Sequence, residues 1–92
     1  MDDWFARSCI EEAAFQEELD LLRETYPHID EVHRSLTTKL ASNPRLGDRL
    51  KYSDEYWLYL TDAIEATPSF WVLYRYDAQY VYLASIKAAD ED

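Results

Sequence analysis

The sequence is poor in the residues that small proteins use for covalent crosslinks and phosphate-binding loops. It holds one cysteine, Cys9, and one glycine. A single cysteine excludes an internal disulfide and gives no sign of an oxidising compartment. There is no glycine-rich phosphate loop, Ser–His–Asp set or cofactor signature, so we expect no cofactor. Cys9 lies in no nucleophilic motif, and we interpret it as a small buried residue.

Basic residues are also scarce. Nine lysines and arginines stand against nineteen aspartates and glutamates, which gives a net charge of -10 at pH 7. Nucleic-acid affinity comes from Lys and Arg side chains that displace counterions, so this charge argues against a nucleic-acid partner. Arg45, Arg49 and Lys51 form the one locally basic segment. A remnant phosphate contact is one interpretation, but acidic residues lie among the three, and a salt-bridged connector is favoured.

Long hydrophobic runs are absent as well. No run approaches the roughly 20 apolar residues that are needed to span a bilayer. The first residues, Met1 to Trp4, lack the basic start and apolar stretch of a signal peptide. We therefore expect a soluble, cytoplasmic protein that does not contact a membrane. Its 92 residues predict one domain, over 1–92, with a single hydrophobic core.

Aromatic and aliphatic residues gather in three runs of the second half, at residues 56–60, 70–76 and 80–86. Such residues favour a pleated, half-buried surface, so each run predicts a strand. Residues 77–79 are short enough to form a hairpin between the last two strands. They contain no glycine, so we expect a longer or bulged loop instead of a tight primed turn. A short first strand is also possible over residues 4–10.

Two helices are predicted ahead of the three runs. Glu11 and Glu12 open the first, since acidic residues suit the positive end of a helix dipole. Pro27 stops it and can serve as the first residue of the second helix, which Asn43 and Pro44 end. Apolar residues recur at helical spacing in both helices. They are Phe15, Leu19, Leu22 and Tyr26 in the first, and Ile29, Val32, Leu36 and Leu40 in the second.

These elements define an α+β domain. The short connection around Pro27 predicts an antiparallel helix hairpin. We expect this hairpin to pack on one face of a small, mainly antiparallel sheet. A polar connector follows the hairpin over residues 45–54, and residues 90–92 form an acidic tail that we expect to fray.

The histidines and the paired acidic residues do not suggest a metal or catalytic site. His28 and His33 are five residues apart without cysteines or carboxylates in a metal-site arrangement, so we interpret each as a surface or helix-edge residue. Adjacent helix positions point in different directions. The Glu-Glu pairs at 11–12 and 17–18 are therefore interpreted as a solvated acidic face, and not as paired catalytic carboxylates.

Several segments combine a helix-ending phrase with hydrophobic strands. The second helix ends in Leu-Ala-Ser-Asn-Pro at residues 40–44, a Leu-Gly pair follows at 46–47, and hydrophobic phrases come at 56–60, 72–77 and 81–86. In this order and spacing, most of the chain resembles the RelE/ParE superfamily of bacterial toxin–antitoxin toxins. Members typically end the second helix in Asn-Pro or a similar breaker. They continue with a strand, a strand that holds an Arg-Val-hydrophobic-Tyr phrase, and a closing hydrophobic strand.

The chain departs from that family at the positions that carry its ribonuclease chemistry. In the family's ribosome-dependent ribonucleases, basic residues on the open sheet face engage the messenger backbone. The resemblance places two such lysines at Trp57 and Tyr59, one arginine at Trp71 and another near Ala88 or Ala89, and none of these is basic here. A tryptophan cannot stabilise an anionic transition state as an ammonium or guanidinium group does. We therefore do not expect inherited ribonuclease activity.

The three aromatic residues at these positions are the predicted site. Trp57 and Tyr59 share one face of their strand, because side chains alternate along a strand. By the resemblance, Trp71 lies on the same face of the next strand, so that the RNA-binding face becomes an aromatic patch. Contiguous exposed aromatic residues mark protein interfaces. The alternative is that some of these rings pack as ordinary core under a loop or the first helix.

The leading hypothesis is a non-catalytic protein that acts by protein–protein binding. The resemblance implies a toxin-like component of a toxin–antitoxin module, of the ParE type, which is directed at DNA gyrase and held by an antitoxin. Two alternatives stay open. One is a ribosome-dependent mRNA interferase with a relocated site, and the other is a phage-type acidic inhibitor that reuses the fold. A homo-oligomer is also possible.

Overall fold

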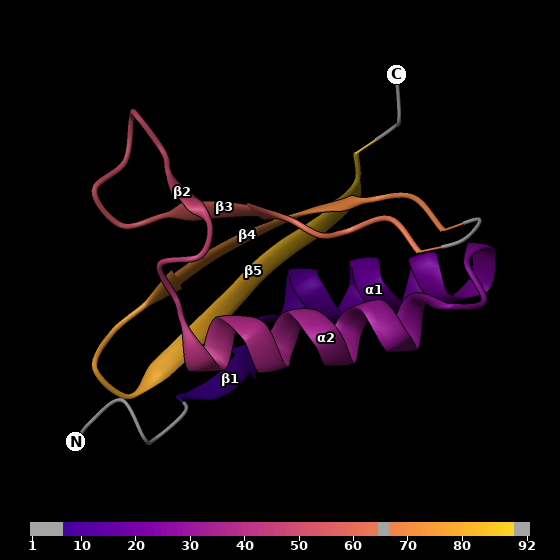
Figure 1. The fold of residues 1–92 in the computed structure, drawn as a ribbon, viewed down its shortest axis with the longest axis horizontal. Coiled ribbons are helices and arrows are strands. Elements are labelled where there is room, and N and C mark those ends of the chain that lie inside the picture. The colour runs from indigo at the N-terminus through magenta and orange to yellow at the C-terminus, as the bar shows by residue number, and fades with distance from the viewer. Residues whose placement is uncertain (1–6, 65–66, 90–92) are drawn as a thin grey trace.

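The computed structural model describes residues 7–64 and 67–89, which form two helices and one five-stranded sheet. In chain order the elements are β1 (Ser8–Glu11), α1 (Ala13–Thr25), α2 (Ile29–Ser42), β2 (Asp48–Arg49), β3 (Trp57–Leu60), β4 (Phe70–Tyr76) and β5 (Tyr80–Ala88). The strand order is β1-β5-β4-β3-β2, and every neighbouring pair is antiparallel except the parallel pair of β1 and β5. The helices run in opposite directions along the same face of the sheet (Figure 1). The predicted α+β class with a mainly antiparallel sheet is confirmed.

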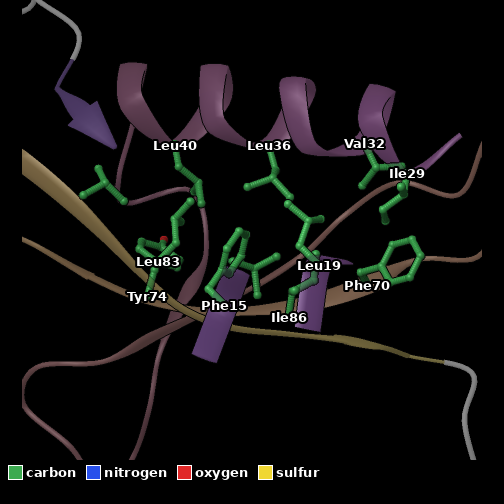
Figure 2. Packing of buried hydrophobic residues seen from close by; sticks show 12 residues of the cluster. Phe15, Leu19, Ile29, Val32, Leu36, Leu40, Phe70, Tyr74, Leu83 and Ile86 are labelled. Carbon is green, nitrogen blue, oxygen red and sulfur yellow. The ribbon is translucent and has the colours of Figure 1, made fainter. Parts of the chain in front are cut away.

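The core lies between the helices and the inner face of the sheet, and Figure 2 shows the α2 side chains pointing toward the strands. All four predicted stripe residues of α2 are buried. In α1, Phe15 and Leu19 are buried, while Leu22 and Tyr26 are partly buried against the core. The buried hydrophobic residues are Phe15, Leu19, Ile29, Val32, Leu36, Leu40, Phe70, Val72, Tyr74, Val81, Leu83 and Ile86.

The start of α1 differs from the prediction. Glu11 is the last residue of β1 and pairs with Leu83, so it is not helical. The N–H of Glu12 then donates to the carbonyl oxygen of Leu83 at 2.9 Å. Because this hydrogen bond extends the strand pairing by one residue, α1 begins only at Ala13.

The start of α2 also differs from the prediction, whereas its end does not. Pro27 lies outside the helix, which begins at Ile29 after His28. The amide of Ile29 donates to the carbonyl oxygen of Tyr26 at 3.2 Å, so the chain turns once before the helix starts. The helix stops at the predicted Asn43, whose N–H still caps the last turn.

The strands match their predictions to different degrees. β4 coincides with its predicted range, β3 starts one residue later than predicted, and β5 continues to Ala88. β2 was not predicted, because two exposed residues in a polar connector are too few to show alternation. β1 covers residues 8–11 instead of 4–10. Residues 4–6 and the predicted acidic tail at 90–92 lie outside the described residues.

The hairpin between β4 and β5 uses an aspartate where a tight turn often uses glycine. The N–H of Asp77 donates to the carbonyl oxygen of Tyr80 at 2.9 Å. The Asp77 carboxylate accepts the amides of Gln79 and Tyr80, each at 2.8 Å, and these bonds lower the pKa of that carboxyl. Side-chain acceptors of this kind are a known property of Asp in turns.

A bulge lies within β5, whereas the absence of glycine at residues 77–79 predicted a longer or bulged loop between the last two strands. Leu73 pairs with Ser85, but the next residue, Tyr74, pairs with Leu83, so Ala84 has no partner on β4. A bulge of this kind shifts the alternation of side chains by one position. Leu83 and Ile86 are therefore both buried although they are three residues apart.

Tyr74 fixes the connector that leads from α2 to β2. Its buried hydroxyl donates to the carbonyl oxygen of Pro44 at 2.6 Å and accepts the N–H of Gly47 at 3.0 Å. Burial raises the pKa of Tyr74 to about 12. A Cβ atom on Gly47 would lie 2.5 Å from the carbonyl oxygen of Leu58, so the close approach of the connector to β3 requires glycine.

Candidate protein-binding site

The three predicted site residues do not converge. Trp57 pairs with Tyr74 and Tyr59 pairs with Val72, and directly paired residues of neighbouring strands project from the same face. Trp57 and Tyr59 do share a face, as predicted, but it is the face that the helices cover, where both are partly buried. Trp71 pairs with Leu60 and projects from the opposite face.

The expectation of one aromatic patch is therefore wrong. The positions taken from the resemblance are offset by one residue between the two strands, and a shift of one residue moves a side chain to the other face. The Trp57 ring packs beside the ring of Tyr76, with 5.6 Å between centroids, as the core alternative proposed. Protein binding by the individual residues stays a prediction, and Trp71, which is 40% exposed, is the most exposed of the three.

Trp71 belongs to an apolar patch on the helix-free face of the sheet, which we call the open face. Register places Leu58 and Leu60 of β3 and Leu73 of β4 on this face with it. Leu60 is 43% exposed, and the other two leucines are partly exposed. The depression beside Trp71 is lined by Leu58, Leu73, Ser85, Lys87 and Ala88. The sequence signal for this patch was present, since Leu58 and Leu60 alternate with the two aromatic residues of β3.

The cations of the open face are already paired. Lys87 forms an ion pair with the Glu18 carboxylate. The Arg75 guanidinium lies 4.1 Å from the ring centroid of Tyr82 and 3.5 Å from a carboxylate oxygen of Glu12. Binding a phosphate would require both cations to exchange these contacts, which disfavours an anionic ligand.

A groove lies on the other side of β3, between that strand and α2. Apolar and polar residues line it together: Val32, Ser35, Leu36, Tyr59, Thr61 and Ile64. Lys39 of α2 reaches across the groove to Asp62, with 3.3 Å between Nζ and Oδ2. Both side chains of this pair are exposed, and exposed ion pairs contribute only about 0–1 kcal/mol. The ion pair is therefore only a weak barrier to a side chain of another molecule that enters the groove.

His33 and Glu11 form a half-buried pair between α2 and β1. Nε2 of His33 lies 2.5 Å from a Glu11 carboxylate oxygen, and the imidazole lies beside the ring of Phe15. The described residues contain no group of three or more His, Cys, Asp or Glu side chains that could hold a metal ion. We interpret this pair as a link between β1 and α2. His28 contacts Glu31 at 3.0 Å at the start of α2, as expected for a helix-edge residue.

The acidic pairs are less solvated than predicted. Glu17 is exposed, but Glu18 accepts hydrogen bonds from Ser85 and from the backbone of Ile86. Glu11 and Glu12 are likewise half-buried, and each contacts a basic residue or histidine. The prediction of a solvated face is therefore wrong for three of these four glutamates.

Cys9 and the basic connector carry no sign of chemistry. Cys9 is half-buried, and its thiol lies 3.5 Å from the carbonyl oxygen of Thr37. Burial, and secondarily the charge of Glu11, raise the pKa of this thiol, which disfavours a thiolate nucleophile. In the connector, Arg49 lies 3.9 Å from Asp54, in agreement with the favoured interpretation.

No protein-family model and no curated protein matches the chain. None of the described helices is both long enough and apolar enough to cross a membrane.

Proposed function

We propose that this chain is a non-catalytic protein that binds a partner protein through the open face of its sheet. The observation that carries the proposal is the apolar patch of Leu58, Leu60, Trp71 and Leu73 on the face without helices. Antiparallel sheets that face water on one side usually carry polar residues there. A partly exposed tryptophan among leucines is instead typical of the centre of a protein interface, where Trp is a favoured anchor.

The charges around the patch support binding over catalysis. Cleavage of RNA requires groups that hold the phosphate, stabilise the developing charge and move protons. Lys87 and Arg75 are the cations of this face, and both are held by glutamates. Trp57 and Tyr59, which stand at the positions of two family lysines, project from the helix-covered face.

The more specific proposal is a toxin-like component of a toxin–antitoxin module, of the ParE type, with DNA gyrase as target and an antitoxin as second partner. Its support is the resemblance of segments 40–44, 56–60, 72–77 and 81–86 to the RelE/ParE superfamily. The order of a short strand, two helices and then a run of strands, on which that resemblance partly rests, is also the order in the fold.

Two assays test this function. Purified protein should bind gyrase and inhibit supercoiling, and Trp71→Ala should weaken binding by about 30-fold, which corresponds to about 2 kcal/mol. Leu21→Ala is the matched control, because Leu21 is a 64% exposed leucine on α1, away from the open face. The same protein should leave messenger RNA intact on translating ribosomes. Cleavage in the ribosomal A site would favour the interferase alternative instead.

A further inference from the structure

The outer edge of β3 is paired over only half of its length. β2 covers Trp57 and Leu58, and β3 continues for two more residues. The N–H of Thr61 donates to Phe70 on β4, so in an antiparallel ladder the N–H and C=O of Leu60 point away from β4. Within residues 7–64 and 67–89, no hydrogen bond reaches these two groups of Leu60. Unpaired edge groups of this kind are a template for another strand.

The connector cannot supply that strand. In the β2–β3 register, Leu46 would stand opposite Leu60. The amide of Leu46 is instead bonded to Asn43, and Gly47 is held by the hydroxyl of Tyr74. These two contacts turn the chain away from β3 before it reaches Leu60. The edge is therefore left open by specific anchoring contacts of the fold.

Both sides of this edge offer apolar surface. A residue opposite Thr61, the next position of β3's edge on the helix-covered face, would point its side chain into the groove against α2, which Val32 and Leu36 line. A residue opposite Leu60 would point to the open face and contact Trp71. Because strand side chains alternate between the two faces, one extended segment can use both surfaces at once.

The charge near the edge selects a basic segment. Asp62 follows β3 and pairs with Lys39 across the groove, but its side chain is 82% exposed, so an incoming cation can reach it, and Asp48 is exposed on β2 beside Leu58. The whole chain carries a net charge of -10. A second copy of the chain would bring the same charge and be repelled, whereas lysines or arginines that flank an apolar strand would be attracted.

We propose that an extended segment of the partner, apolar in its centre and basic at its ends, adds to β3 as a further strand beyond β2. It exchanges hydrogen bonds with Leu60 and places alternate side chains in the groove and on the open face. This inference rests on the proposed function and names the binding mode of its partner.

A capped peptide of sequence KKVWVLKK is the probe. It should slow hydrogen exchange of the Leu60 amide at millimolar concentration and shift the NMR resonances of Val32 and Trp71. N-methylation of alternate central residues keeps the side chains of the peptide but removes the N–H donors along one of its two edges. Two such peptides are possible, one for each edge. The one that lacks the N–H groups facing β3 should not bind. A peptide with glutamate in place of lysine should bind at least tenfold more weakly. No protection of Leu60, or equal binding of all these peptides, overturns the proposal.

Two variants at one position separate backbone from side chain. Leu60→Pro removes the outward N–H without removing a bond to β4, and prolines are tolerated at such edge positions. It should lose at least tenfold more peptide binding than Leu60→Ala, which keeps the N–H and removes only the part of the side chain that contributes to the apolar patch. Equal binding by both variants overturns strand addition. If Leu60→Pro does not fold, the N-methyl series on the unaltered chain decides alone.

The same variants distinguish the inference from the proposed function. If gyrase binding is lost in Trp71→Ala but unchanged in Leu60→Pro, the function stands and strand addition fails. If neither variant affects gyrase binding, the proposed function and strand addition both fail. Sedimentation that shows a dimer, dissociated by the peptide, would mean that a second copy occupies the edge and would overturn the assignment to a basic partner.

Discussion

The carboxylate of Glu18 on α1 accepts the backbone N–H of Ile86 on β5 at 3.0 Å. β1 pairs with β5 only as far as Leu83, so the rest of this edge lacks a neighbouring strand. α1 lies along that stretch, and Glu18 provides the acceptor that a strand would otherwise supply. One edge of the sheet is thus closed by a helix, while the opposite edge at Leu60 stays open. This asymmetry identifies β3 as the edge where a partner can add.

Glu18 should make stability depend on pH. Desolvation alone would raise its pKa, but the hydrogen bonds from Lys87, Ile86 and Ser85 outweigh it and lower the pKa below its usual 4.5. A lowered pKa in the folded state stabilises the fold above about pH 4.5, and this contribution is lost as the pH falls through the folded value. Glu18→Gln should cost about 1 kcal/mol at pH 7 and less at pH 3, as measured by urea unfolding. Glu17→Gln, at an exposed position, is the control and should change neither value by more than about 0.5 kcal/mol.

Tyr74 should produce the opposite dependence at high pH. Its pKa is raised to about 12 by burial, so the folded state holds the phenolic proton more tightly than the unfolded chain, whose tyrosines titrate near 10. The stabilisation is complete below pH 10 and declines as the pH rises toward 12. Tyr74→Phe should cost about 1–3 kcal/mol at pH 7, because the Gly47 amide and the Pro44 carbonyl lose their partner. It should also remove this part of the alkaline decline. An unchanged pH profile in the variant would contradict the assignment.

Leu36 should be a centre of the core. It is 1% exposed and points from α2 toward the sheet (Figure 2). Leu36→Ala removes buried methyl groups and leaves a cavity, so we expect a loss of about 2–5 kcal/mol in chemical unfolding. Leu21→Ala, at 64% exposure, should lose less than about 0.5 kcal/mol. A loss below about 1 kcal/mol for Leu36→Ala would mean that α2 does not supply the core as described.

The sequence predicted the parts of the fold that repeat a strong pattern. The α2 stripe from Ile29 to Leu40 and the alternation in β4 each involve several residues, so one misread position does not change the prediction. β2 has two residues and shows no pattern. Its position depends on the hydroxyl of Tyr74, which is distant in sequence from the connector that it holds. The spacing of hydrophobic residues along the sequence cannot predict a contact between residues so far apart in the chain.

The candidate site was harder to predict because it depends on register. Placing Trp71 beside Trp57 needed the pairing of β3 with β4 to be known to within one residue, since a single step reverses the face. The bulge at Ala84 changes the alternation in β5 for the same reason. The alternation within β3 did separate Leu58 and Leu60 from the aromatic residues. It did not indicate which of the two faces the helices cover.

The two tryptophans should therefore behave differently when each is changed to alanine. Trp57 packs against the rings of Tyr74 and Tyr76 on the helix-covered face, so Trp57→Ala should destabilise the fold by about 2–4 kcal/mol. For a domain of this size, that is a fall in Tm of roughly 10–25 °C. Trp71 lies on the open face, so Trp71→Ala should lower Tm by only a few degrees. The same change should make the free energy of partner binding less favourable by about 2 kcal/mol. Thermal melts and binding measurements on both variants decide the assignment. If Trp71→Ala melts as low as Trp57→Ala, and its binding falls only in proportion to unfolding, the open face is a structural surface and the proposed interface is wrong.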